Sequence, residues 1–142
     1  MQKENLLNVA LSQIAPVWLD KEATLQKIYT QIQQAATTQT ELIVFGEGLL
    51  PGYPFWLALA DGAHWNTSLN KELYAHYLRN SITIENGDLD PLCALAKKHH
   101  MAIYLGIIER PLDRGGHSVY ASLVYVNQQG EIQSVHRKLQ PT

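Results

Sequence analysis

Four consecutive apolar residues at positions 42–45 limit most strongly what this chain can fold into. They read Leu-Ile-Val-Phe, and Gly-Glu-Gly at positions 46–48 ends the run abruptly. A short run that is apolar at every position is typical of a strand buried on both faces, as in the sheets of α/β proteins. We therefore expect residues 42–45 to form a buried strand, with Glu47 just beyond its carboxyl end.

Helical and strand-like patterns alternate on either side of this run. Asp20 is a candidate N-cap, and the apolar spacing that follows it predicts a helix to Ala36. Asp90-Pro91 predicts another helix to about His99, with Asp90 as the N-cap and the proline at the first helical position. A helix is also expected within residues 69–80. The expected strands are residues 8–14, 101–108, 119–126 and 131–135, the last two joined by a hairpin loop at 127–130.

The order of these elements predicts one α/β domain with a mixed sheet. A chain of 142 residues is long enough for one such domain with its own core, and we find no linker or internal repeat. The composition is 46% hydrophobic and 17% charged, which fits a globular protein rather than a disordered one. We expect residues 1–142 to be a single, incomplete domain.

Charge and cysteine content exclude several classes of partner and cofactor. A net charge of -2 is too balanced to favour nucleic acid or an anionic membrane surface. No apolar run is long enough to span a bilayer, and the start is polar, so we expect a cytoplasmic protein. Cys93 is the single cysteine, and the six histidines lack metal-ligand spacing. We expect no metal and no other cofactor.

Glu47 and Lys138 are the residues whose positions suggest chemistry. Each follows an expected strand, and ligands of open α/β sheets gather at the carboxyl ends of strands. Position alone favours the ordinary alternatives, which are a solvated loop glutamate and an exposed basic cluster at 136–138. A pair of opposite charges that meets in one pocket from distant segments would instead suggest function.

Three further residues have a structural and a functional interpretation. Cys93 lies in the first turn expected of its helix, where the dipole could lower the pKa of a thiol. Its apolar neighbours favour a small buried core residue instead. Tyr53 and Trp56 follow Glu47 closely, and they fit a core or the lining of a pocket equally well.

Two stretches of the sequence resemble segments of the nitrilases. Residues 44–56, VFGEGLLPGYPFW, are similar to the segment around the catalytic glutamate of that family. Residues 136–142, HRKLQPT, are similar to the segment around its catalytic lysine, and YLGIIER at 104–110 also resembles the family. The resemblance extends from Val9 to Thr142. Gly48 departs from the pattern, because alanine is more familiar there.

The resemblance implies the N-terminal part of an α-β-β-α sandwich that carries a Glu–Lys–Cys triad. Glu47 matches the base and Lys138 the cation that stabilises developing charge, while Tyr53 and Trp56 fall where a substrate pocket is expected. The implied reaction turns a small nitrile into a carboxylic acid and ammonia through a cysteine thioimidate and thioester. An amidase or carbamoylase of the same superfamily is the alternative.

The resemblance also implies a nucleophile that follows the lysine, usually as Cys-Trp-Glu after another strand. Thr142 comes four residues after Lys138, and Cys93 does not match the nucleophile's position. We therefore expect the 142-residue chain to lack the nucleophile and to be inactive by itself. The full-length form is expected to be a homo-oligomer, either a dimer or a spiral. A non-catalytic module that assembles with full-length partners is a further alternative.

Overall fold

The protein forms one five-stranded sheet in the computed structural model, which describes residues 6–64 and 66–140. Strand order follows chain order, with β1, β2 and β3 parallel and β4 and β5 antiparallel to their predecessors. The expected α/β class with a mixed sheet is confirmed. The strands are β1 (Val9–Ser12), β2 (Leu42–Phe45), β3 (Ala102–Glu109), β4 (Tyr120–Val126) and β5 (Ile132–Arg137).

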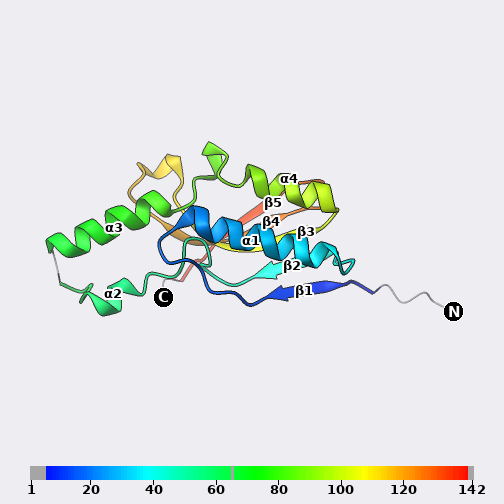
Figure 1. Ribbon diagram of the computed structural model, residues 1–142. Coiled ribbons are helices and arrows are strands. Elements are labelled where there is room, and N and C mark those ends of the chain that lie inside the picture. Colours follow the sequence, from blue (N-terminus) through cyan, green and yellow to red (C-terminus); the bar gives the residue numbers. More distant parts are fainter. Residues whose placement is uncertain (1–5, 65, 141–142) are drawn as a thin grey trace.

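Helices α1 and α4 lie on one face of this sheet, whereas α2 and α3 lie beyond one end of it (Figure 1). The short helix α2 was not predicted, and neither were the two 3-10 turns. The bounds are α1 (Lys21–Ala36), α2 (Trp56–Leu59), α3 (Ser68–Asn80), α4 (Asp90–His99), η1 (Ile84–Asn86) and η2 (Leu112–Arg114).

The two helices over the sheet begin in different ways. The side chain of Asp20 accepts a hydrogen bond from the Ala23 amide at 2.9 Å, so the predicted N-cap of α1 is confirmed. The prediction for Asp90 is wrong, because Leu89 is the N-cap of α4 and Asp90 is its first helical residue. The turn η1 continues almost directly into α4, and the amide of Asp90 already donates to the Gly87 carbonyl at 3.0 Å.

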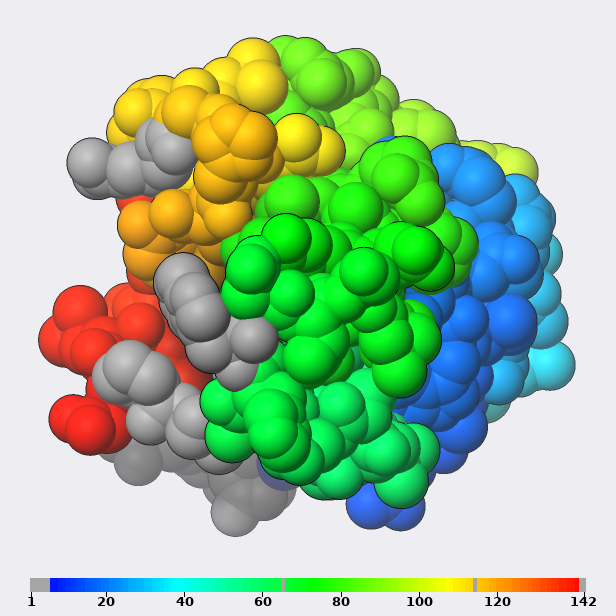
Figure 2. Space-filling view, turned by 90° about the vertical axis from the view of Figure 1, so that its left-hand side faces the viewer, coloured from blue at the N-terminus to red at the C-terminus, as the bar shows by residue number. Residues whose placement is uncertain are grey.

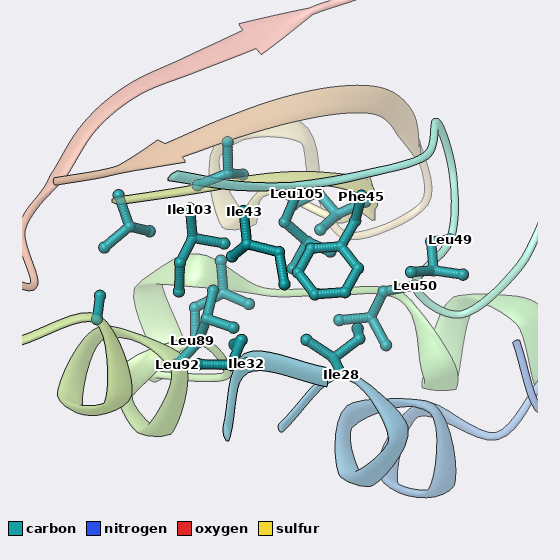
Figure 3. Packing of buried hydrophobic residues seen from close by; sticks show 14 of the residues in the cluster. Ile28, Ile32, Ile43, Phe45, Leu49, Leu50, Leu89, Leu92, Ile103 and Leu105 are labelled. Atoms are coloured by element: carbon teal, nitrogen blue, oxygen red, sulfur yellow. The ribbon is translucent and has the colours of Figure 1, made fainter. Parts of the chain in front are cut away.

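A single hydrophobic core fills the space between the sheet and these helices. Apolar side chains of α1 and α4 meet alternate residues of β2, β3 and β4 (Figure 3). Burial of this apolar surface is the main force that holds the helices on the sheet. The fully buried members include Ile28, Ile32, Leu92, Ile43, Ile103, Leu105, Ile107 and Val124.

Only one face of β2, which lies between β1 and β3, is buried. Ile43 and Phe45 point into the core, whereas Leu42 and Val44 on the other face are half-buried. The expectation of a strand buried on both faces is therefore wrong for the described residues, because α1 and α4 cover the same side. The uncovered side, here called the open face, also carries Leu11, which is 75% exposed, and Leu123, which is 41% exposed.

Candidate active site

Glu47 lies on a short excursion of the chain across the open face of β3. The chain leaves β2 after Phe45 and returns at Leu50, which bridges to Ile107 of β3. Between these points the backbone passes directly over Gly106, where an added Cβ would lie 2.2 Å from the Gly46 carbonyl oxygen. Glycine at position 106 permits this close crossing, which holds Glu47 above the sheet.

Lys138 directly follows the last residue of β5. Its amide donates to the Ala121 carbonyl at 2.8 Å, so the backbone is still paired with β4 at this position. Successive side chains of a strand point to opposite faces, so Arg137 points to the helix-covered face and Lys138 to the open one. In Figure 2 the C-terminal segment, in red, lies at the left, below the orange residues that lead into β4.

The structure brings the two charged residues predicted from the sequence into contact. Lys138 Nζ lies 2.8 Å from Glu47 Oε1, although the residues are 91 positions apart in the chain. The pair is not buried, since the Lys138 side chain is 38% exposed and that of Glu47 is 59% exposed. A carboxylate and an amine held this close can exchange protons with a third group placed beside them.

A cavity of about 500 Å³ opens beside this ion pair. Its volume is in the range of sites for small molecules. Its lining surface is mostly apolar, although polar side chains line it besides the charged pair. The lining residues are Glu47, Gly106, Ala121, Ser122, Leu123, His136, Lys138, Leu139 and Gln140.

Tyr53 and Trp56 lie outside the lining of this cavity. The ring of Tyr53 packs against that of Phe55 with 5.6 Å between the centroids. Trp56 begins α2 and packs edge-on against the buried Tyr77 of α3 with 6.1 Å between the centroids, and it lines a separate cavity between these helices. After Glu47 the chain turns towards α3 and carries Trp56 to that helix, whereas the ring of Tyr53 stays near Gly48, 3.9 Å from the place where a Cβ there would be. Their role as substrate-pocket residues stays a prediction.

A partly buried ion pair between Glu109 and Arg137, next to Lys138, was missed in the sequence. The carboxylate of Glu109, which is 4% exposed, accepts hydrogen bonds from Arg137 at 2.8 and 2.9 Å and from Ser122 at 2.7 Å. Burial alone would raise the pKa of Glu109, but these hydrogen bonds and the Arg137 charge outweigh it and lower the pKa. The sequence contained a signal that Glu109 would be buried, because it continues the alternation of inward-pointing residues set by Leu105 and Ile107.

Cys93 has neither the position nor the environment of an activated nucleophile. It lies on α4, on the helix-covered face, so the sheet separates it from the Glu47–Lys138 pair (Figure 1). Burial raises the pKa of its thiol, and the nearby Asp90 raises it further. These two effects outweigh a backbone hydrogen bond at Cys93, which lowers the pKa. Cys93 is half-buried against the core, as a small apolar residue would be.

Neither a metal site nor a membrane span is found in the part of the chain that the structure describes. No cluster of three or more histidine, cysteine, aspartate or glutamate residues among residues 6–64 and 66–140 could hold a metal ion. Within the same residues, no helix combines the length and apolar character needed to cross a bilayer.

Known proteins similar to this chain identify its family. The family model of carbon-nitrogen hydrolases matches residues 8–142. The chain belongs to the carbon-nitrogen hydrolase family. The predicted resemblance to an N-terminal portion is confirmed by its relatives. A nitrilase from an unknown prokaryotic organism, called Nitrilase 2, is 35% identical over 137 residues, which make up 96% of this chain and 41% of that protein.

Two other carbon-nitrogen hydrolases show the same partial overlap. An arylacetonitrilase from Hypocrea virens is 32% identical over 139 residues, covering 98% of this chain and 39% of the relative. The solved structure of the NitN amidase from Neterenkonia sp. AN1 superimposes with a TM-score of 0.63 and 15% identity, covering 95% of this chain and 45% of that one. The likeness to NitN shows the shared fold. This chain spans about two fifths of the length of the curated relatives it matches.

Proposed function

We propose that this chain supplies the base and the cation of a nitrilase active site. The observation that supports the proposal most strongly is the 2.8 Å contact between Glu47 and Lys138 beside a cavity of about 500 Å³. The curated relatives that match the chain include a nitrilase and an arylacetonitrilase. A nitrile is therefore the proposed substrate, and an amide is the alternative.

Each of the two residues has a separate task in the proposed reaction. Glu47 accepts the proton of a cysteine thiol, and the thiolate attacks the nitrile carbon to form a thioimidate. Lys138 stabilises the negative charge that develops on the substrate nitrogen during this attack. Water then adds, ammonia leaves to give a thioester, and a second water releases the carboxylic acid and restores the thiol.

The nucleophile of this proposal lies outside the 142 residues. Cys93 is on the wrong face of the sheet, and burial keeps its thiol protonated near neutral pH. The open face supports an additional segment, because a row of apolar side chains there includes the exposed Leu11 and Leu123. We propose that a second sheet with the nucleophile covers this face, and that residues 1–142 alone are inactive.

The decisive experiment uses the gene product from residue 1 to the first in-frame stop codon. Ammonia release is measured with arylacetonitriles, aliphatic nitriles and the corresponding amides, next to a protein restricted to residues 1–142. The proposal predicts turnover of nitriles by the product that contains a downstream cysteine and none by residues 1–142. Turnover of amides without nitriles would support the amidase alternative.

Substitutions of Glu47 and Lys138 test whether the ion pair is required for that activity. Glu47→Gln removes the base and Lys138→Met removes the cation, and each is expected to lower kcat by about 100-fold or more. Glu72→Gln and Lys98→Met alter exposed charges on α3 and α4 and serve as matched controls. Full activity in Glu47→Gln would contradict the assigned roles. Activity of residues 1–142 that Cys93→Ala abolishes would identify Cys93 as the nucleophile.

A further inference from the structure

Arg137 and Lys138 are consecutive residues whose side chains serve opposite faces of the sheet. The guanidinium of Arg137 reaches the buried Glu109 on the helix-covered face, and the amine of Lys138 reaches Glu47 on the open face. The position of Lys138 therefore depends on how firmly the backbone of Arg137 is held.

Residues of two other strands, β3 and β4, hold Arg137 in place. Its Nε and Nη2 atoms donate to the two carboxylate oxygens of Glu109 on β3, which is a bidentate geometry that fixes the plane of the guanidinium. Ser122 of β4 pairs with Arg137 in the sheet and also donates to Glu109. The guanidinium carbon lies 4.9 Å from the ring centroid of Tyr120.

This anchoring comes at the point where β5 ends. The amide of Lys138 makes a backbone hydrogen bond to Ala121, and the next residue, Leu139, is exposed. Strand ends fray readily when only backbone hydrogen bonds hold them. The side-chain pair on Arg137 lies one residue before Lys138 and opposes fraying there.

We propose that Glu109, Ser122 and Arg137 form a positioning clamp that holds Lys138 against Glu47. The importance of the clamp for catalysis rests on the proposed function. Its effect on the position of Lys138 can be tested without catalysis. Glu109 and Arg137 are positioning residues in this proposal, because they act through Lys138 rather than on a substrate.

Carbodiimide cross-linking measures the contact directly in the 142-residue chain. The reagent joins a carboxylate and an amine in contact through an amide bond, and the water that is lost converts the carbodiimide into a urea. We expect a cross-link between Glu47 and Lys138, identified by mass spectrometry of the joined peptides. Lys138→Arg removes the reactive amine and is the negative control.

The test compares the yield of this cross-link among folded variants. Glu109→Gln and Arg137→Met are expected to lose most of it. Lys21→Met is the matched control, because it removes the ion pair between Lys21 and Asp88, with 3.1 Å between the charged atoms, which joins α1 to the turn before α4. Lys21→Met should keep the full yield of the cross-link even if its melting temperature falls as far as those of the clamp variants.

Two results would decide against the clamp. A full yield in folded Glu109→Gln and Arg137→Met would show that Lys138 is positioned independently of Arg137. An equal loss in Lys21→Met would show that the yield follows stability alone. Where a clamp variant is unfolded by circular dichroism, Ser122→Ala is used instead, because it removes one hydrogen bond and leaves the ion pair. A full yield in folded Ser122→Ala would equally reject the clamp.

Steady-state kinetics distinguish the clamp from the proposed function. They are measured on the gene product that extends from residue 1 to the first in-frame stop codon. If both hold, Glu109→Gln lowers kcat by about tenfold to 100-fold with little change in KM, because the cation is misplaced in the transition state. A lost cross-link with unchanged kcat would uphold the clamp and reject the catalytic role of Lys138.

Discussion

The Cα atom of Glu47 lies 2.7 Å from the place where a Cβ on Gly106 would be. Any side chain at position 106 therefore forces the Glu47 excursion away from β3. We expect Gly106→Ala to destabilise the fold by about 1–3 kcal/mol through overpacking, measured by urea unfolding. It should also weaken the cross-link between Glu47 and Lys138. Gly46→Ala is the control, because its Cβ would meet nothing within 4 Å.

The ion pair between Glu109 and Arg137 makes stability depend on pH. The pKa of Glu109 is lower in the folded protein than its usual value, so the ionised form is favoured by folding. Its contribution is complete above the unfolded pKa and is lost as pH falls through the folded pKa. Urea unfolding between pH 7 and pH 3 should show this loss, and Glu109→Gln should reduce it. An unchanged pH dependence in Glu109→Gln would contradict the assignment.

Cys93 is expected to be a slow thiol. Because burial raises its pKa, the thiolate fraction at neutral pH is smaller than that of a free cysteine. Reaction with a disulfide reagent should be slower than that of a cysteine-containing peptide at pH 7, and it should accelerate only at more alkaline pH. A rate above the peptide's at pH 7 would show an activated thiol. Cys93→Ser gives the background.

The open face predicts association of the isolated chain. Leu11 and Leu123 expose apolar surface on the same side of the sheet, and such surface drives self-association in water. Sedimentation velocity should show association of residues 1–142 that weakens in a Leu11→Lys, Leu123→Lys double variant. Leu59→Lys adds charge at an even more exposed leucine on α2, outside the open face, and should leave association unchanged. A monomeric parent chain would contradict this expectation.

Local patterns predicted the order of the strands and of the longer helices, whereas the pairing of Glu47 with Lys138 was expected from the resemblance to the nitrilases. The helix after Asp20 and the strand before Glu47 carry strong local signals, which the structure confirms. Contacts that depend on tertiary placement were harder to predict. Whether Leu42 and Val44 are buried depends on what covers the second face, and the sequence of β2 contains no information about that.

The placement of Trp56 and of Glu109 shows the same limit. Trp56 follows Glu47 by few residues, but α2 carries it to α3 instead of the cavity beside Lys138. Glu109 is one of several charged residues in a segment, 104–110, that resembles the nitrilases. Its partner Arg137 comes 28 residues later. Sequence spacing could not pair these two, because the pairing follows from the sheet order of three strands.

The irregular pairing of β4 with β5 has a consequence for which basic side chain meets Glu47. Val126 pairs with Ile132 and Tyr125 with Ser134, so Gln133 is an extra residue on β5. A regular ladder that started from the same Val126–Ile132 pair would place Gln133 opposite Tyr125 and shift every later pair by one residue. Arg137 would then lie opposite Ala121 on the open face, and Lys138 would point to the helix-covered face. The bulge thus selects the amine of Lys138 rather than the guanidinium of Arg137 as the group beside Glu47.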